Sequence, residues 1–297
     1  MRIDLHTHSR VSDGTDTPTE LIHAARDAGL DVVALTDHDT TDGWAEAATA
    51  AEEAGIGLVP GIELSTRHGR RGVHLLGYLL DPAYPPLAEE LDRILGGRGG
   101  RVAQMVSRLN ELGLAIEVDD VSAASVDAVS TGRPHVADAL VRLGHVADRD
   151  EAFSRYLSWG RPAYVGHYAP DLIETIGLVT SAGGVAVIAH PWGRSSEAYR
   201  LREADLAELQ AAGLVGIEAD HQDHDGPMRD ALRAMARNLG LIVTGSSDYH
   251  GSGKKDHDLG VNTTAPDQLA ALLDRAAAAS AASGRRTPEP TGAVRVR

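Results

Sequence analysis

Residues 1–9 read MRIDLHTHS, a short apolar run followed at once by histidines at positions 6 and 8. Residues two apart in a strand point to the same side, so His6 and His8 project together if Ile3–Leu5 forms a strand. Two neighbouring imidazoles are suitable ligands for a divalent metal ion, although two surface histidines would give the same pattern. The stretch predicts a strand that delivers metal ligands, and further ligands are then expected elsewhere in the chain.

Similar apolar runs recur along the chain, with helical patterns between them. The candidate strands are Ile3–Leu5, Asp31–Leu35, Gly57–Ile62, Val73–Leu79, Val185–Ala189, Val215–Ala219 and Leu241–Gly245. The candidate helices between them are Pro18–Gly29, Asp42–Ala54, Asp171–Ala182, Glu203–Ala212 and Pro227–Leu239. This alternation predicts an α/β fold with a mainly parallel sheet, either open or closed into a barrel.

Nearly every candidate strand has a histidine or a carboxylate at or near one end. Besides His6 and His8, the residues at these positions are Asp13, His38, Glu63, His74, His190, Asp248 and His250. Singly they have ordinary explanations, since Asp13 fits a Ser-Asp-Gly turn and His74 fits a buried histidine with a partner. The strand ends of a closed parallel sheet converge on one mouth, however, so the coincidence predicts a metal centre there.

Nine candidate ligands are too many for one ion, because an ion binds about four to six groups with water among them. Two or three divalent ions are therefore expected, with a carboxylate such as Glu63 bridging between them. A mixed set of histidines and carboxylates favours Mn²⁺, Zn²⁺ or Fe²⁺ over Ca²⁺. Thiolate ligands are excluded, because the chain contains no cysteine.

The composition limits the partners of the 297-residue chain, whose formal net charge is −15. Double-stranded DNA is disfavoured because it binds to basic surfaces, whereas metal ions can reverse the local sign for a small anionic ligand. Residues 1–9 lack the apolar segment of a signal peptide, and no apolar run approaches the about 20 residues that span a bilayer. A cytoplasmic protein without membrane contact is expected.

Residues 85–161 interrupt the alternation, because their patterns are helical and contain no convincing strand. The helical patterns are Leu87–Leu95, Val102–Leu112, Pro134–Leu143 and Glu151–Trp159. We interpret this segment as an inserted helical domain that caps the mouth of the barrel, with structural padding as the alternative. Residues 1–84 and 162–276 then form the discontinuous barrel. Residues 277–297 are small, polar and proline-containing, which predicts a disordered tail.

The ordered motifs HTH, SDG, TDHD, GIELS, HLLGY, AHP and SDYHG contain all nine candidate ligands and resemble those of the PHP (polymerase and histidinol phosphatase) family. The match extends from about Met1 to Asn262. This resemblance implies a distorted (β/α)7 barrel with a small inserted helical domain and a trinuclear metal centre. It implies one ion on His6, His8, Glu63 and Asp248, a second on Glu63, His74 and His190, and a third on Asp13, His38 and His250. Mn²⁺ is the expected metal, with Fe²⁺ and Zn²⁺ as alternatives.

Four further segments resemble the small bacterial PHP phosphoesterases. These segments are Gly132–Ala137, Asp150–Phe153, Arg161–Val165 and Glu218–His224, although Asp220 and Gln222 depart from the usual Tyr and Pro. Members of this subgroup remove the 3′-phosphate of nucleoside 3′,5′-bisphosphates, and some trim RNA from its 5′ end. The resemblance therefore implies a small phosphorylated nucleotide or a short single-stranded RNA as the substrate.

The resemblance and the chemistry of phosphate esters together suggest roles for several residues. The candidates for catalysis are His190, Asp248, His221 and His224, with the three histidines as possible proton donors. The candidates for binding a second phosphate are Arg133, His135, Arg161 and His224, because guanidinium groups bind phosphate through two parallel hydrogen bonds. For each of these side chains, a solvated or salt-bridged surface position is the alternative.

Three other functions remain open from the sequence. A histidinol-phosphate phosphatase has similar metal motifs but lacks this insert. An amidohydrolase-type enzyme that cleaves C–N bonds also begins with an HxH motif, although the closing SDYH and the number of ligands disfavour it. A non-catalytic metal-binding module would be expected to have lost ligands, and all nine positions are filled here.

Overall fold

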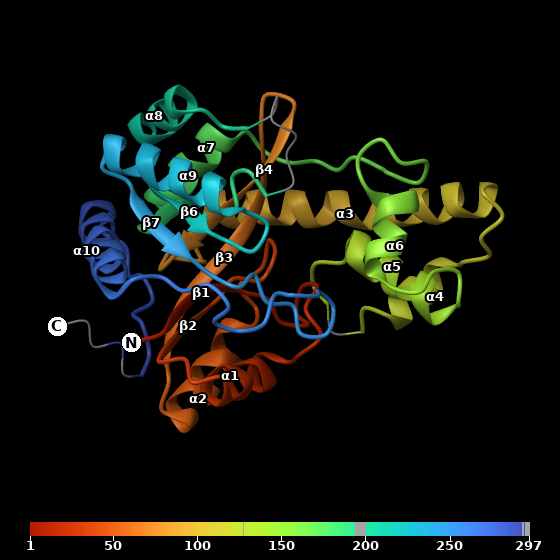
Figure 1. The fold of residues 1–297 in the computed structure, drawn as a ribbon, viewed down its shortest axis with the longest axis horizontal. Helices are drawn as coiled ribbons and strands as arrows, with labels where there is room; N and C mark the ends of the chain where they lie inside the picture. The colour runs from red at the N-terminus through yellow and green to blue at the C-terminus, as the bar shows by residue number, and fades with distance from the viewer. Residues whose placement is uncertain (127, 194–199, 293, 295–297) are drawn as a thin grey trace.

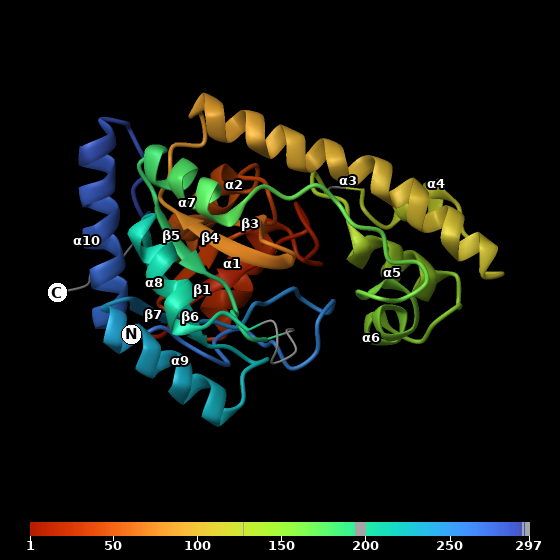
Figure 2. The same cartoon turned by 90° about the horizontal axis from the view of Figure 1, so that it is seen from above.

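The structure, a computed structural model, describes residues 1–126, 128–193, 200–292 and 294. Figure 1 shows a curled sheet with its surrounding helices on one side and a smaller group of helices on the other. The long helix α3 (Pro85–Glu111) connects the two parts, as the view from above in Figure 2 makes clear. The predicted combination of an α/β barrel and an inserted helical domain is therefore confirmed in outline.

In the described ranges, the strands form one seven-stranded sheet in the order β1-β2-β3-β4-β5-β6-β7. The strands are β1 (Ile3–Thr7), β2 (Val32–Leu35), β3 (Gly57–His68), β4 (Arg71–Tyr78), β5 (Val185–Ile188), β6 (Leu214–Asp220) and β7 (Ile242–Gly245). Thr7 at the end of β1 forms a bridge with Tyr249 beyond β7, so the sheet curls until its two edges approach each other. This curvature makes the sheet a distorted barrel.

Strand β4 is the exception to the mainly parallel arrangement, because it runs antiparallel to both β3 and β5. Strand β3 continues to His68, beyond its predicted end at Ile62, and a two-residue loop of Gly69 and Arg70 leads directly into β4. A loop this short permits only an antiparallel hairpin, since a parallel neighbour needs a long crossover. The reversal places the beginning of β4 at the same end of the barrel as the carboxyl ends of the other strands.

Helices cover the outer face of the barrel. They are α1 (Pro18–Asp27), α2 (Trp44–Ala54), α7 (Leu172–Ser181), α8 (Glu203–Ala211), α9 (Gly226–Leu239) and α10 (Pro266–Ser283). The strands are buried on both faces, as expected for a sheet that is enclosed by helices. Helix starts follow familiar rules: Asp171 and Asp225 accept hydrogen bonds from the first turns of α7 and α9.

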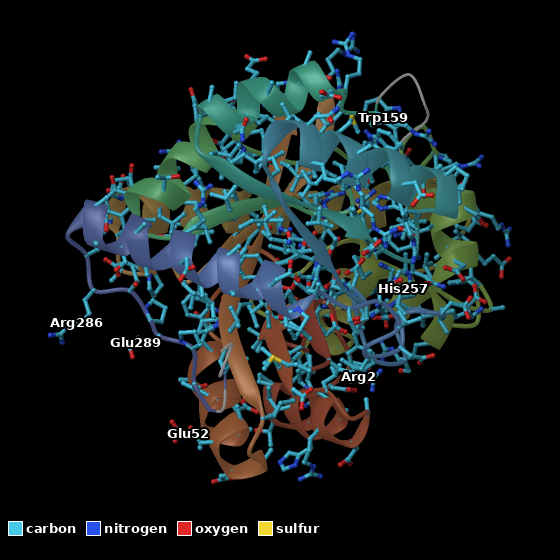
Figure 3. The ribbon with its side chains drawn as sticks, turned by 60° about the vertical axis from the view of Figure 1, so that its left-hand side comes forward. Arg2, Glu52, Trp159, His257, Arg286 and Glu289 are labelled. Atoms are coloured by element: carbon cyan, nitrogen blue, oxygen red, sulfur yellow. The ribbon has the colours of Figure 1, made fainter. Side chains whose placement is uncertain are left out.

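Helix α10 differs from the disordered tail that was predicted from residue 277. Its alanine-rich sequence favours a helix, and Leu269, Leu272 and Ala276 pack against the barrel. Beyond the helix, Thr291 exchanges backbone hydrogen bonds with Leu58. Figure 3 shows Arg286 and Glu289 beyond the end of α10, far from His257. Residues 293 and 295–297 of the predicted tail lie outside the described part of the chain.

The inserted segment contains α3, α4 (Val118–Ala123), α5 (Arg133–Arg142), α6 (Arg149–Ala152) and the short π-helix η1 (Phe153–Leu157). Its apolar side chains form a core of their own, which includes Met105, Leu109 and Leu140. The prediction of separate helices at Leu87–Leu95 and Val102–Leu112 was wrong, because α3 continues through the glycine-rich residues between them. Each internal glycine costs about 1 kcal/mol, and burial of α3 side chains in both the barrel core and the insert core offsets this cost.

Polar contacts hold the insert over the mouth of the barrel. Arg149 of α6 donates to the backbone carbonyls of Asp13 (3.2 Å) and Gly253 (3.3 Å), which belong to two different barrel loops. The amide of Val129 donates to the carbonyl of Val11 at 2.9 Å. The predicted boundaries of the insert stay a prediction. In the part of the chain described, no helix is long and apolar enough to cross a membrane.

Candidate metal centre

All nine predicted ligands lie at one end of the barrel. The strands β1, β3 and β4 and the loops that follow β1, β2, β5 and β7 carry His6, His8, Asp13, His38, Glu63, His74, His190, Asp248 and His250. The antiparallel direction of β4 explains why His74 stands near the start of its strand whereas the others stand near or beyond strand ends. Six of the nine side chains are buried and the other three are partly buried.

Glu63 lies at the centre of this group, and its side chain is almost completely buried. In the described structure, ring nitrogens of five histidines lie within 3.2 Å of its two oxygens: His6, His8, His38, His74 and His190. Its Oε2 faces three of these rings and its Oε1 faces the other two. A carboxylate in this position is arranged to bridge ions that are bound on its two sides.

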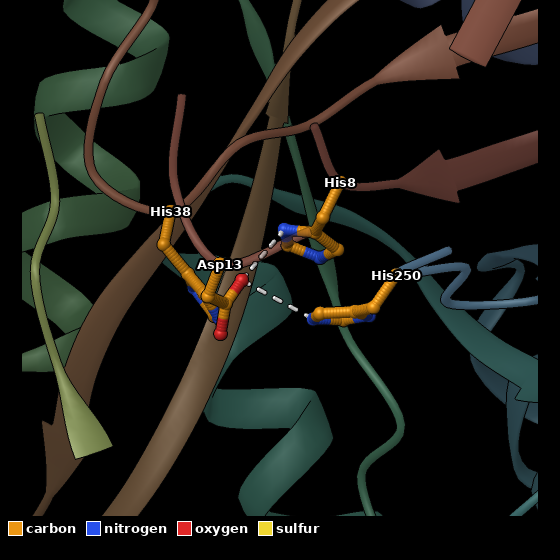
Figure 4. A group of neighbouring side chains, drawn as sticks. All are labelled: His8, Asp13, His38 and His250. Carbon is orange, nitrogen blue, oxygen red and sulfur yellow. Dashed lines mark ion pairs between the residues drawn. The ribbon is translucent and has the colours of Figure 1, made fainter. Parts of the chain in front are cut away.

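Asp13 is the centre of a second group, which Figure 4 shows. Its Oδ1 lies 3.2 Å from Nε2 of His250 and 3.8 Å from Nδ1 of His8, and its Oδ2 lies 3.7 Å from Nε2 of His38. The rings of His8 and His250 stack with their centroids 4.2 Å apart. His8 and His38 therefore belong to the surroundings of both carboxylates.

Asp248 joins the group from the loop after β7, which lies beside the end of β1. Its Oδ1 lies 3.6 Å from Nε2 of His6 and 3.5 Å from Nε2 of His8. Its Oδ2 accepts a hydrogen bond from Nε2 of His221 at 3.2 Å and contacts the ammonium group of Lys254. The first and the last strands of the barrel thus supply side chains to the same point.

The hydrogen bonds of two histidines show that these side chains fit metal ions. Nδ1 of His6 donates to Glu218, which leaves a lone pair on Nε2, only 3.2 Å from Glu63 and 3.0 Å from the ring of His8. Nδ1 of His250 donates to the carbonyl of Asp248, so its Nε2 turns a lone pair toward Asp13. Lone pairs that face carboxylate oxygens repel unless a cation lies between them, which is the arrangement of a metal site.

The electrostatics of the group indicate the same need for positive charge. Burial raises the pKa of Glu63, but His38, His74 and His6 outweigh this effect and hold that pKa well below its usual range. Burial lowers the pKa of His6, but the carboxylates around it raise that pKa well above its usual value. Buried carboxylates that stay ionised require protons or metal ions on the neighbouring rings.

The described side chains form four groups whose ligand atoms could share an ion. They are His8, Asp13, His38 and His250; His6, His8 and Asp248; His38, Glu63 and His74; and His221, Asp248 and His257. The first three resemble the predicted division among three ions, except that His8 and His38 lie between groups. His257 was not predicted, and the assignment of each ligand to an ion stays a prediction.

Glu218 of β6 is a functional candidate that the sequence reasoning missed. It is completely buried, its Oε1 accepts from Nδ1 of His6 at 3.2 Å, and its Oε2 accepts from the amide of His190 at 2.8 Å. It also accepts from the hydroxyl of Ser246. A carboxylate inside an apolar strand is costly without partners, and this was the signal that could have identified it.

Three of the five non-glycine residues with positive φ in the described chain lie at the mouth of the barrel, and the other two are Leu79 and Asp256. Asp39, His190 and Asp248 have φ angles of 56°, 27° and 53°, in a region that non-glycine residues seldom adopt. Two of the three are candidate ligands, and the third follows His38. Strain of this kind persists where surrounding contacts over-determine the conformation, as they do at functional sites.

The candidate proton donors are placed differently from one another. His190 and His221 border the ligand group, and Nδ1 of His221 accepts from the amide of Asp223 at 3.0 Å, so its Nε2–H is directed at Asp248. Both nitrogens of His224 are engaged with the main chain, at Ala219 and Trp192. The ring of His224 is therefore not available to a substrate in this conformation.

The predicted phosphate-binding residues are also separated. Arg133 packs against the rings of Phe153 and Tyr164. His135 is buried, and its Nδ1 accepts from the amide of Gly132 at 3.1 Å. The side chain of Arg161 is exposed to solvent. The structure does not bring these three side chains to one point.

Comparison with known proteins places this geometry in a family. The family model described as the PHP domain matches residues 4–208. The 3′,5′-nucleoside bisphosphate phosphatase of Chromobacterium violaceum is 41% identical over 258 residues, which cover 87% of this chain and 90% of that protein. The 5′-3′ exoribonuclease of Haemophilus influenzae is 34% identical over 249 residues, which cover 84% of this chain and 90% of that protein.

A solved structure shows the same architecture. A Bifidobacterium adolescentis protein classed as a metal-dependent phosphoesterase superposes with a TM-score of 0.87 at 37% sequence identity. The superposition covers 92% of this chain and 96% of the other. The similarity therefore includes the insert as well as the barrel.

Proposed function

The chain belongs to the PHP domain family, and from this premise we propose that it is a metal-dependent phosphoesterase that removes the 3′-phosphate of nucleoside 3′,5′-bisphosphates. Trimming of short single-stranded RNA from its 5′ end is the second candidate activity, because the chain also resembles exoribonucleases along most of its length. A solved metal-dependent phosphoesterase structure superposes on 92% of this chain, which includes the barrel and the insert.

The observation that carries the proposal is the convergence of ring nitrogens and carboxylates around Glu63. We assign the nine side chains at the barrel mouth as ligands of two or three divalent ions, with Glu63 as the bridge. Mn²⁺ is the first choice, and Fe²⁺ and Zn²⁺ accept the same ligands. Ions bound there would neutralise phosphate oxygens and lower the pKa of a bound water toward about 7.

Side chains next to the candidate ligands hold these ligands in position. Glu218 holds the ring of His6 with Nε2 toward the centre, and His221 holds Asp248 through its Nε2–H. His190 lies between Glu63 and His221, and burial lowers its pKa to about 4, which suits its assignment as a metal ligand rather than as a proton donor. Lys254 brings a positive charge to the same side of the centre.

A comparison of three substrates tests the proposed function. Purified protein with Mn²⁺ is expected to release phosphate from adenosine 3′,5′-bisphosphate and to lose that activity after chelation. A 5′-phosphorylated oligoribonucleotide tests the exonuclease activity, and histidinol phosphate tests the histidinol-phosphatase alternative. Hydrolysis of histidinol phosphate alone would overturn the proposal. Activity on an amide panel without phosphate release would favour an amidohydrolase-type enzyme, and no activity on any substrate would favour a non-catalytic metal-binding module.

A further inference from the structure

Three arginines of the insert and one histidine lie together beside the metal centre. Arg98 and Arg101 belong to α3, Arg133 begins α5, and His167 lies on the segment that returns from the insert to the barrel. Burial, and after it the charges of all three arginines, lower the pKa of His167 to about 3. We call these four residues the arginine cluster.

Arg98 and Arg101 are buried and His167 is partly buried, and each of these three side chains has a buried nitrogen without a partner among the residues described. The side chain of Arg101 donates from Nε to the carbonyl of Val165 at 2.7 Å, whereas its Nη2 has no hydrogen-bond partner among the residues described. Arg101 is only 4% exposed and Arg98 only 8%. Nε of Arg98 and Nε2 of His167 are likewise buried without a partner in the described part of the chain.

The charges around Arg101 make this burial costly. Burial, and after it the positive charges of Arg133 and Arg98, lower the pKa of Arg101 to about 9. Buried cations are normally balanced by an anion within hydrogen-bond distance. Asp39 provides one such partner, for Arg98. Nη2 of Arg101 and Nε2 of His167 have no such partner among the residues described. An anionic ligand could accept hydrogen bonds from both.

The arginine cluster borders the metal centre. Nη2 of Arg98 donates to Asp39 and to Oγ of Ser65 at 2.9 Å. Asp39 directly follows the candidate ligand His38, and Ser65 pairs across the β3–β4 hairpin with the candidate ligand His74. The cluster therefore lies on the side of the centre that His38 and His74 form.

A glycine on α3 makes this proximity possible. A Cβ atom at Gly97 would lie 3.2 Å from Cβ of Tyr168, which is closer than most real contacts. The residue next to Tyr168 is His167, so the close approach of this segment to α3 brings His167 toward the two arginines of the helix.

We propose that Arg98, Arg101, Arg133 and His167 bind a phosphate group of the substrate that is not hydrolysed. The proposal rests on the proposed function, in which the 3′-phosphate lies at the metal centre and the 5′-phosphate must be held elsewhere. Guanidinium groups bind phosphate oxygens through paired hydrogen bonds, and several converging arginines match its charge. The sequence predicted four residues for a second phosphate: Arg133, His135, Arg161 and His224. The arginine cluster retains Arg133 and does not include the other three.

The first test compares two substrates that differ only in the retained phosphate. Arg101→Met is expected to lower kcat/KM for adenosine 3′,5′-bisphosphate about 10- to 100-fold, as loss of charged hydrogen bonds does. Its kcat/KM for adenosine 3′-monophosphate, which lacks the 5′-phosphate, is expected to change less than about threefold. Arg93→Met is the matched control, since Arg93 lies on the same helix with its side chain 61% exposed. Equal losses on both substrates in Arg101→Met would overturn the proposal.

A binding test separates this proposal from the proposed function. Adenosine 5′-monophosphate carries only the retained phosphate, so it is expected to raise the Tm of the wild-type protein and of Arg93→Met but not that of Arg101→Met. The Tm of ligand-free Arg101→Met is expected to equal or exceed that of the wild type, because one of several repelling buried cations is removed. A lower ligand-free Tm, with an unchanged response to the nucleotide, would identify Arg101 as a structural residue.

The activity test and the binding test distinguish a wrong function from a wrong assignment of the arginine cluster. If no phosphate ester is hydrolysed by the wild type, the proposed function is wrong, while the Tm response to adenosine 5′-monophosphate still decides whether the arginine cluster binds phosphate. If the esters are hydrolysed but the nucleotide response is the same in wild type and Arg101→Met, only the cluster assignment is wrong. A 5′-phosphorylated oligoribonucleotide, assayed in parallel, shows whether the same cluster serves RNA.

Discussion

Glu218 fixes the orientation of His6, because its carboxylate accepts the proton on Nδ1 of that ring. Glu218→Gln keeps the size of the side chain but weakens this hydrogen bond. We expect the Mn²⁺ concentration for half-maximal activity to rise about 10- to 100-fold, as the loss of such supporting carboxylates does elsewhere. Metal titrations of activity measure the effect. An unchanged half-maximal concentration would show that Glu218 has no part in positioning His6.

Asp248 is the candidate ligand from the last strand. Asp248→Asn removes a negative charge from the group while it keeps the shape, so turnover is expected to fall at least about a hundredfold with the fold retained. Phosphate release measures the loss of turnover, and circular dichroism checks that the fold is retained. Asp230→Asn, at an 80% exposed side chain, is the control. Near-normal turnover of metal-replete Asp248→Asn would contradict the ligand assignment.

His167 is expected to make the stability of the folded protein depend on pH. Burial and the charges of its neighbours lower its pKa from 6.5 to about 3, so the folded protein binds this proton less readily than the unfolded chain. Its contribution to stability is present above pH 6.5 and decreases as the pH falls toward 3. The charged or titratable groups that act on it are Arg101, Arg98, Arg133 and His74.

The magnitude of this pH effect is measurable. The free energy of unfolding is expected to fall by about 1–2 kcal/mol from pH 7 to pH 5 through His167 alone. Denaturant titrations of wild type and His167→Gln at both pH values, at one metal concentration, isolate this contribution. If both proteins show the same pH slope, His167 is not the group responsible.

The nine candidate ligands could be selected from the sequence, whereas the residues around them could not. The nine follow or begin apolar runs, which is a local pattern, and their role as ligands stays a prediction. Arg98 and Arg101 gave no such pattern, because their position depends on how α3 meets a hairpin far away in the sequence. Arg98 is 59 residues from Asp39, its partner. Contacts of this kind are decided by tertiary packing.

Helix α1 illustrates a local rule that holds in the structure. Thr17 accepts from the amide of Glu20 at 3.0 Å, and Glu20 accepts in return from the amide of Thr17 at 2.8 Å. Thr17→Ala is expected to lower the free energy of unfolding by about 1 kcal/mol, the usual effect of losing an N-cap. Chemical denaturation measures it. A parallel metal titration should be unchanged, and a loss of metal affinity would show that α1 also shapes the centre.

The elements that the sequence predicted less well share a physical reason. The alternating apolar pattern identified all seven strands, but it carries no information on strand direction, so β4 was not recognised as antiparallel. The glycines between Leu95 and Arg101 suggested a break because their intrinsic helix propensity is low. Packing at both ends of α3 overrides that propensity, and burial against the barrel similarly extends α10 past residue 277.

Arg149 joins the insert to two barrel loops and is itself paired with Asp138 in α5. Arg149→Met is expected to free these contacts, so the insert should sit less firmly over the mouth. We expect kcat/KM to fall about tenfold, a loss typical of misplaced substrate-binding groups.

Hydrogen exchange provides the structural measurement for Arg149→Met. Amides of α5 and α6 should exchange faster, while those of β2 and β5 should not change. Arg142→Met is the control, since Arg142 is half exposed and its side-chain bonds to the residues described are made to Asp120 within the insert. Unchanged exchange together with unchanged kcat/KM would show that other contacts are enough to hold the insert in place.

The contact between the first and last strands has a consequence for synthesis of the protein. His6 belongs to the first strand of the barrel, whereas Asp248 and His250 follow the last strand and are made much later. A chain still growing on the ribosome therefore cannot assemble the full set of ligands, even where its early strands have already folded. An enzyme of this design would remain inactive during synthesis until the last strand of its barrel and the loop after it have left the ribosome.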